Sequence, residues 1–332
     1  MASVKDFCFD LAGKALRFAP GSRRFSDWSG PRKSQIVMYH RVLPQAEPFS
    51  IDPALSPDFR RHMRLLKRQF RVVPLAEMIT AWEAGRDLPG AVAVTFDDGY
   101  RDNYLHAFPI LKEEGVPATI FLATDFIGTG GMPWHDRVLA GFRDARAQNF
   151  AYPEAGIAEG PMGEAPHRRG LAFRILGWLK RFTPEDREKH IAAMLMQCNP
   201  ENREREPLML DWREVRAMLP HGITFGAHTL SHPILSRLTP QAIEAEVIGS
   251  KLAIEKETGV PVTLFAYPNG QPGDYNEDCK AILKKSGFSC AVSTSAGVNT
   301  PDTDRFALRR RHVWDATADG FYFRFLLERL RA

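Results

Sequence analysis

Two adjacent carboxylates, Asp97 and Asp98, follow the apolar segment AVAVTF at residues 91–96. Neighbouring side chains of like charge repel each other, so the pair needs a physical reason. If one carboxylate binds a divalent cation, the repulsion falls and the second carboxylate can take up a proton. The alternative is a polar turn that caps a helix, which is the ordinary role of Asp-Asp-Gly after a strand.

Two histidines, His228 and His232, have the i, i+4 spacing that brings two imidazoles to one ion within a helical turn or a tight loop. Thr229 stands where the metalloprotease motif H-E-x-x-H has its glutamate, so a base has to come from elsewhere in the chain. The Asp pair can supply both a third ligand and a base. Taken alone, a histidine pair at this spacing is more often a pair of ordinary, partly exposed side chains.

Strand-like and helical segments alternate along most of the chain. Strands are predicted over residues 34–40, 91–96, 118–123, 223–228, 262–267, 290–295 and 305–313. Helices are predicted over residues 56–70, 104–115, 239–259 and 276–287. This alternation favours a parallel sheet with crossover helices. Residues 128–210 interrupt it, which indicates a partly helical insertion at one end of the core.

Polar, reactive side chains lie at or just after the ends of several predicted strands. They are Asp97, Asp98, His228, Tyr267, His312 and His40. In a parallel α/β barrel the carboxyl ends of all strands meet at one mouth, where such enzymes hold their catalytic residues. We therefore expect these side chains to converge. The alternatives are a buried structural role for His40 and a basic surface around His312, which follows three arginines.

The composition fits a globular protein with a sizeable core: 332 residues, 44% of them hydrophobic and 25% charged. A net charge of +4 is too small to favour nucleic-acid binding, and the arginine runs at 23–24 and 309–311 are more typical of a solvated surface. The four cysteines form no C-x-x-C pair, which argues against a disulfide framework or a cysteine zinc site.

No signal peptide or transmembrane helix is predicted, so we expect a cytoplasmic protein. Residues 1–33 form an N-terminal amphipathic extension and residues 321–332 a C-terminal amphipathic helix. Either these segments pack on the domain, or they give the protein a peripheral contact with the inner face of the membrane.

TFDDG at residues 95–99, together with HTLSHP at 228–233, closely resembles the first two motifs of the polysaccharide deacetylase family of carbohydrate esterases. IVMYHRV near the start and FAYPNG at 265–270 are similar to the branch that acts on bacterial exopolysaccharides. The resemblance covers residues 34–127 and 205–315. It implies a distorted parallel (β/α)7 barrel over residues 34–320, with the insertion at about 128–210.

The resemblance also implies roles for individual residues. Asp97 corresponds to the general base, and Asp98, His228 and His232 to the ligands of a divalent metal, for which Zn2+ is expected. His312 corresponds to the acid that protonates the leaving amine. In the family's third motif an arginine orients the base, but Ala266 stands at that position here.

The expected reaction is metal-assisted hydrolysis of an N-acetyl group on an amino-sugar glycan, or on a lipid-linked or nucleotide sugar precursor. The backbone N–H of Tyr267 is the expected oxyanion donor, and the side chains expected to contact substrate are Tyr267, His40, Tyr100, Trp134 and Trp314. Two alternatives stay open: an amide hydrolase acting on a small ureide or formamide, and a catalytically weak glycan-binding homologue. His135 and Asp136 are expected in a surface loop of the insertion, and the alternative is a position of one of them near the mouth.

Overall fold

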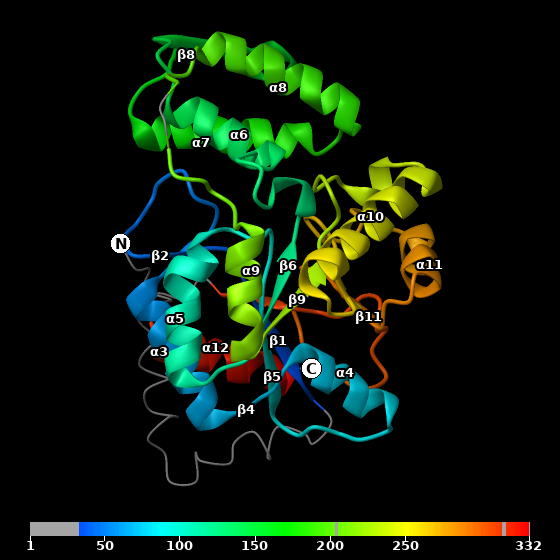
Figure 1. Ribbon diagram of the computed structural model, residues 1–332. Helices are drawn as coiled ribbons and strands as arrows, with labels where there is room; N and C mark the ends of the chain where they lie inside the picture. The colour runs from blue at the N-terminus through cyan, green and yellow to red at the C-terminus, as the bar shows by residue number, and fades with distance from the viewer. Residues whose placement is uncertain (1–32, 203–204, 314–316, 332) are drawn as a thin grey trace.

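The computed structural model describes residues 33–202, 205–313 and 317–331 (Figure 1). The predicted N-terminal extension therefore lies almost entirely outside the described residues, and so does Trp314. No helix within the described ranges is long and apolar enough to cross a membrane.

The core is a parallel sheet whose strands follow the order β11-β10-β9-β6-β5-β1-β12. Strand β4 lies off this path and pairs with β5. This curled seven-strand path confirms the predicted distorted (β/α)7 barrel. The strands are β1 (Gln35–Tyr39), β4 (Arg71–Val72), β5 (Ala91–Phe96), β6 (Ala118–Leu122), β9 (Ile223–Ala227), β10 (Leu264–Ala266), β11 (Cys290–Val292) and β12 (Arg311–His312).

Residues 305–313 were predicted as one strand, and this is wrong because the segment changes its pairing partner midway. Leu308 N–H donates to the Ala291 carbonyl at 3.0 Å, beside β11. Three residues later, β12 pairs with β1 at Met38 and His312. The segment thus runs from one end of the sheet to the other, and only its last part keeps strand geometry.

Helix α10 (Pro240–Thr258) begins and ends where its sequence signals predict. Thr239 caps α10, and Gly259 ends it at a positive φ of 70°. The other helices of the barrel are α3 (Ser56–Gln69), α4 (Leu75–Glu83), α5 (Phe108–Glu114), α9 (Trp212–Met218) and α11 (Glu277–Lys285). Helix α4 and the short strands β2 (Val42–Leu43) and β3 (Ala54–Leu55) were not predicted.

The segment between β6 and α9 packs around an apolar core of its own. It contains α6 (Trp134–Arg143), β7 (Asn149–Tyr152), β8 (Ile157–Pro161), α7 (Ala165–Leu179) and α8 (Pro184–Cys198). Figure 1 shows these elements in green, stacked beyond the end of the barrel where β6 finishes. Their buried apolar side chains form a cluster that also takes in Phe49 from the loop between β2 and β3.

The C-terminal helix α12 (Ala318–Arg331) packs against α3. Phe321, Phe325 and Leu326 are buried within the main core cluster of the barrel. These side chains of α12 are thus covered by the protein, and the membrane contact considered for residues 321–332 stays a prediction.

Candidate metal centre and active site

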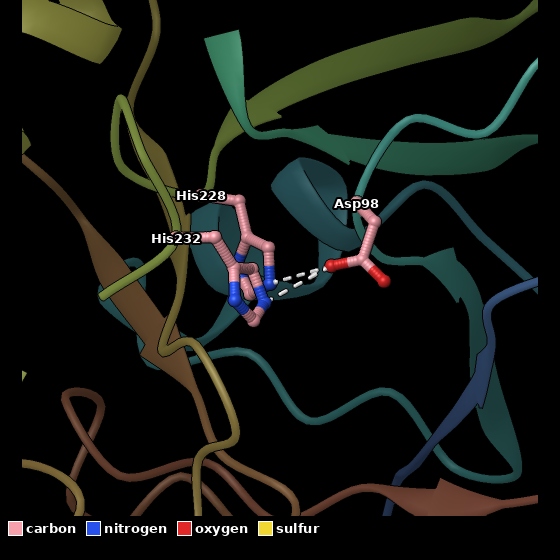
Figure 2. Close-up of side chains that lie close together, drawn as sticks. All are labelled: Asp98, His228 and His232. Carbon is pink, nitrogen blue, oxygen red and sulfur yellow. Dashed lines mark ion pairs between the residues drawn. The ribbon is translucent and has the colours of Figure 1, made fainter. Parts of the chain in front are cut away.

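Asp98, His228 and His232 converge on one buried point (Figure 2). Asp98 Oδ1 lies 3.3 Å from His228 Nε2 and 3.1 Å from His232 Nε2. All three potential ligand atoms lie within 4.8 Å of one another. The structure therefore brings together the three residues that the sequence predicted as ligands.

The strand register explains how residues so far apart in sequence meet. Leu122 of β6 pairs with Ala227 of β9, so the two strands end side by side. His228 N–H then continues the ladder by donating to the Leu122 carbonyl at 3.0 Å. On the other side of β6, β5 ends at Phe96 directly before the two aspartates.

The loop that carries His232 is held in an unusual conformation. Thr229 and His232 have positive φ angles of 67° and 58°, which cost energy in non-glycine residues. Thr229 Oγ1 accepts a hydrogen bond from His232 N–H at 3.1 Å. Glu246 on α10 accepts from Leu230 N–H and Ser231 N–H at 2.8 and 3.0 Å. These bonds fix the turn that brings the second imidazole beside the first.

The donor set fits a divalent cation. His228 Nδ1 lies 2.7 Å from the Ala266 carbonyl, so the proton of a neutral ring sits on Nδ1 and Nε2 keeps a lone pair toward Asp98. Burial lowers the pKa of His232 to about 4, which keeps this ring neutral. Two imidazoles and a carboxylate that point at one another form the ligand set of an open zinc-type site.

Asp97 has a different partner from its neighbour. Arg310 Nη1 lies 2.7 Å from Asp97 Oδ1, and Nη2 lies 2.6 Å from Oδ2, which makes a bidentate ion pair. Burial opposes the charge on Asp97, but Arg310 outweighs it and holds the pKa of the carboxyl below its usual value. The two adjacent carboxylates are tolerated because they have different partners: Asp97 pairs with Arg310, and Asp98 faces the two histidines.

Arg310 is the functional residue that the sequence interpretation missed. It is fully buried, and its Nε donates to the Ser293 carbonyl at 2.8 Å, which fixes the guanidinium. A basic surface was the alternative considered for the arginines before His312. This alternative is wrong for Arg310, because its side chain is buried. A signal was present, because Phe306, Leu308 and Arg310 alternate along an extended segment, and residues at this spacing share one face.

His312 and His40 lie together beside the ion pair, with ring centroids 5.4 Å apart. His312 Nδ1 is 3.8 Å from Asp52 Oδ2. Burial, together with nearby His40 and Arg310, lowers the pKa of His312 to about 3. The imidazole of His312 is therefore neutral at neutral pH.

A pocket of about 380 Å³ opens above these groups. Its walls come from the barrel mouth, from the loop between β2 and β3, and from helices α6 and α7 of the inserted segment. The lining residues used below are Asp52, Asp97, Asp98, Trp134, His135, Phe173, Leu176, Gly177, Lys180, His228, His232, Asn269 and His312, and His40 lies with them. The inserted segment thus shares the pocket with the metal ligands.

The structure contradicts the roles predicted for Tyr267 and Tyr100. Tyr267 N–H already donates to the Val292 carbonyl at 3.1 Å, so it cannot serve an oxyanion. The Tyr267 hydroxyl donates to the Phe306 carbonyl at 2.8 Å, and the side chain is fully buried. Tyr100 is also buried, and its hydroxyl donates to Asp136 Oδ2 at 2.9 Å. Neither ring is available to a substrate.

Asn269 offers a donor in place of Tyr267. It follows β10, has a positive φ of 59° and lines the pocket. Its side-chain Nδ2 is buried and has no hydrogen-bond partner among the described residues. A buried donor without a partner is costly unless a ligand uses it.

His135 and Asp136 do not lie in a surface loop, which corrects the prediction. They are buried in the first turn of α6, and the His135 ring centroid lies 5.0 Å from that of His232. His135 Nε2 is 3.3 Å from Asp136 Oδ2 and 3.1 Å from the Tyr100 hydroxyl. Trp134, the preceding residue, lines the pocket, and the Arg187 guanidinium lies 4.5 Å from its ring centroid.

Solved structures share this fold. A Streptococcus pyogenes deacetylase, PplD, solved in complex with acetate, superimposes with a TM-score of 0.61 and 18% identity, covering 88% of this chain and 97% of that chain. IcaB from Ammonifex degensii gives a TM-score of 0.58 and 20% identity, covering 90% of this chain and 97% of the other.

Sequence comparison identifies the family. YxkH of Bacillus subtilis (strain 168), which is described as a polysaccharide deacetylase, is 24% identical over 287 residues, covering 85% of this chain and 72% of YxkH. The family model for polysaccharide deacetylases matches residues 84–291, more than half of the chain and the part that supplies Asp97, Asp98, His228 and His232. The chain therefore belongs to the polysaccharide deacetylase family and is a deacetylase that hydrolyses amide bonds.

Proposed function

We propose that this protein is a Zn2+-dependent deacetylase that removes N-acetyl groups from an amino-sugar glycan or its precursor, with Asp97 as the base. The observation that carries the proposal is the separation of the two aspartates: Asp98 joins the two histidines, whereas Asp97 is held by Arg310 at the same pocket. When bound by Asp98, His228 and His232, the cation supplies a Lewis acid that acidifies water and polarises the acetyl carbonyl.

Asp97 takes the proton of the attacking water in this proposal. The role needs an ionised carboxylate in a fixed orientation, and Arg310 favours the charged form of Asp97 while gripping both of its oxygens. Asn269 Nδ2 is placed to donate to the oxygen of the tetrahedral intermediate, where charge develops.

His312 is the proposed acid. Because its ring is neutral at rest, it has to gain a proton within the catalytic cycle before the C–N bond breaks. The proton that Asp97 removes from water is the nearest source. The products are acetate and a free amino sugar.

The proposed substrate is an N-acetylated glycan of the exopolysaccharide type, or a lipid-linked or nucleotide sugar that precedes it, met on the cytoplasmic side. The family membership and the motif resemblance support this class. The alternative of a catalytically weak glycan-binding homologue rested on the absence of an arginine at position 266. Because Arg310 holds Asp97 instead, that absence no longer favours the alternative. A small ureide or formamide remains the second candidate substrate class.

Acetate release from N-acetylated chitooligosaccharides tests the proposal. The purified protein is assayed with and without a chelator, with Zn2+ restored afterwards, and beside Asp97→Asn. We expect the chelator to abolish acetate release and Zn2+ to restore it. We expect Asp97→Asn to retain bound metal but to release little acetate. Release that resists both the chelator and the substitution would overturn the mechanism.

A further inference from the structure

One stripe of helix α7 forms a wall of the pocket that holds the metal ligands. The stripe consists of Phe173, Leu176 and Gly177 in the helix and of Lys180, which directly follows it as the C-cap residue. These positions have the i, i+3, i+4 and i+7 spacing that places side chains along one face of a helix. The barrel therefore supplies the chemistry of the pocket, and the inserted segment supplies a second wall.

The middle of the stripe is open. A Cβ atom added to Gly177 would meet nothing within 4 Å. Phe173, one turn away, is 37% exposed although it is a large apolar side chain, and the Arg169 guanidinium lies 4.4 Å from its ring centroid. An exposed aromatic ring beside a gap in a concave pocket can pack against the apolar face of a sugar ring.

Lys180 gives the stripe its charge. The described residues provide no carboxylate within ion-pair distance of its ammonium group. Of the carboxylates that line the pocket, Asp97 is paired with Arg310 and Asp98 belongs to the ligand cluster. Asp52 lies beside His312. The charge of Lys180 acts on Asp274 over a distance longer than an ion pair, so an anionic group that enters along α7 would find a cation without a direct ion pair among the described residues.

We propose that the α7 stripe is a subsite for a substrate portion that carries an anionic group, a phosphate or a carboxylate, next to the N-acetyl sugar. Phe173 packs on the sugar ring, Gly177 leaves room for it, and Lys180 binds the anion. The proposal deepens the proposed function and rests on it, because the subsite serves the same reaction.

The first experiment uses a matched pair of glycines on α7. Gly170 and Gly177 both have open space around a new Cβ, but only Gly177 lines the pocket. We expect Gly177→Phe to raise KM at least tenfold and Gly170→Phe to leave it unchanged, with both variants folded. Equal kinetics in the two variants would overturn the subsite.

The second experiment compares three probes that differ in charge: methyl N-acetylglucosaminide, N-acetylglucosamine 1-phosphate, and a disaccharide of N-acetylglucosamine and glucuronic acid. We expect Lys180→Ala to raise KM for the anionic probes about tenfold and to change KM for the neutral probe by less than about twofold. Lys180→Arg should bring KM for the anionic probes most of the way back to the wild-type value. Added salt should raise KM for the anionic probes only. Lys189→Ala, on α8, is the control.

The two anionic probes distinguish a phosphate from a carboxylate as the recognised group. Equal effects of Lys180→Ala on neutral and anionic probes would overturn anion recognition even if the deacetylase proposal holds. If the wild-type protein deacetylates neither these probes nor N-acetylated chitooligosaccharides, the proposed function fails and the subsite is tested by calorimetry. Binding of N-acetylglucosamine 1-phosphate that weakens about tenfold in Lys180→Ala supports the subsite, and unchanged or absent binding overturns it.

Discussion

The barrel mouth and the inserted segment contribute to the same pocket in different ways. At the mouth, Asp97, Asp98 and His228 follow strand ends whose positions are set by parallel pairing. In the inserted segment, Phe173 and Lys180 project from one face of a helix that rests on its own apolar cluster. At the barrel mouth, strand pairing and hydrogen bonds fix the positions of a few polar atoms. In the inserted segment, packed helices form one wall of the pocket.

This difference indicates that catalysis and substrate selection are built on separately packed regions. Changes at the mouth should act on metal content and kcat, because the groups there hold the cation and the base. Changes in α7 should act on KM, because this helix borders the pocket and supplies none of the three ligands. The experiments below test this division, in order of decreasing effect.

The largest effect is expected from Asp98→Ala. Removing one of three ligands should abolish metal binding and lower kcat by about 10³-fold or more. Metal analysis of the purified variant, together with acetate release, checks this outcome. Glu159→Ala, an exposed carboxylate in β8, should keep the metal and the activity. Full metal occupancy in Asp98→Ala would place the cation elsewhere.

Arg310→Met should lower kcat by about 10²-fold, because a bidentate partner no longer orients Asp97. The variant removes the group that lowers the pKa of Asp97, so burial dominates and the pKa rises. The acid limb of the pH–rate profile should therefore move to higher pH. Arg310→Lys should shift it less, since it keeps the charge, and exposed Arg309→Lys is the control.

The same ion pair contributes to the pH dependence of stability. Asp97 has a folded pKa below its ordinary value of 3.8, so its contribution is present above about pH 4. It is lost as the pH falls through the folded pKa. Thermal unfolding across this range should show a smaller acid-side loss in Arg310→Met. Parallel pH curves for the variant and the wild type would mean that the pair does not stabilise the fold.

Much of the barrel could be predicted from sequence because its signals are local. The apolar segment 91–96 is a strand with the predicted bounds, and Thr239 and Gly259 bound a helix as expected. Parallel strands then place their ends together, which is why Asp98, His228 and His232 could be expected to meet. The alternation of strands with helices was enough to predict this convergence, and the resemblance to the family then assigned Asp98 as the ligand and Asp97 as the base.

The remaining parts of the site depend on contacts that local patterns do not encode. Arg310 reaches Asp97 because residues 305–313 leave β11 and join β1, a change of partner set by the closure of the sheet. His135 reaches the site because the inserted segment folds back over the mouth. Tyr267 was misplaced as a donor because the parallel ladder runs one residue further than the strand itself and uses its N–H.

Ile191→Ala tests the inserted segment as a packing unit. Ile191 is fully buried in the cluster of the inserted segment, so its truncation should cost about 2–5 kcal/mol of unfolding free energy. We expect KM to rise severalfold while metal content stays unchanged. Ile254→Ala, an equally buried position in the barrel cluster, is the matched control. If Ile191→Ala loses the metal, the two regions are not independent.

The smallest effects are expected from Gly170→Ala and Gly177→Ala. Each substitution replaces a helical glycine that has open space around it, so each should stabilise the protein by up to about 0.5–1 kcal/mol. The stability gains should be similar, because both positions lie on α7. Only Gly177→Ala should raise KM, by about twofold, because one methyl group then enters the pocket. Denaturant unfolding and steady-state kinetics on the same preparations separate these two effects. A KM change shared by both variants would trace the effect to the rigidity of α7 and not to the space beside Gly177.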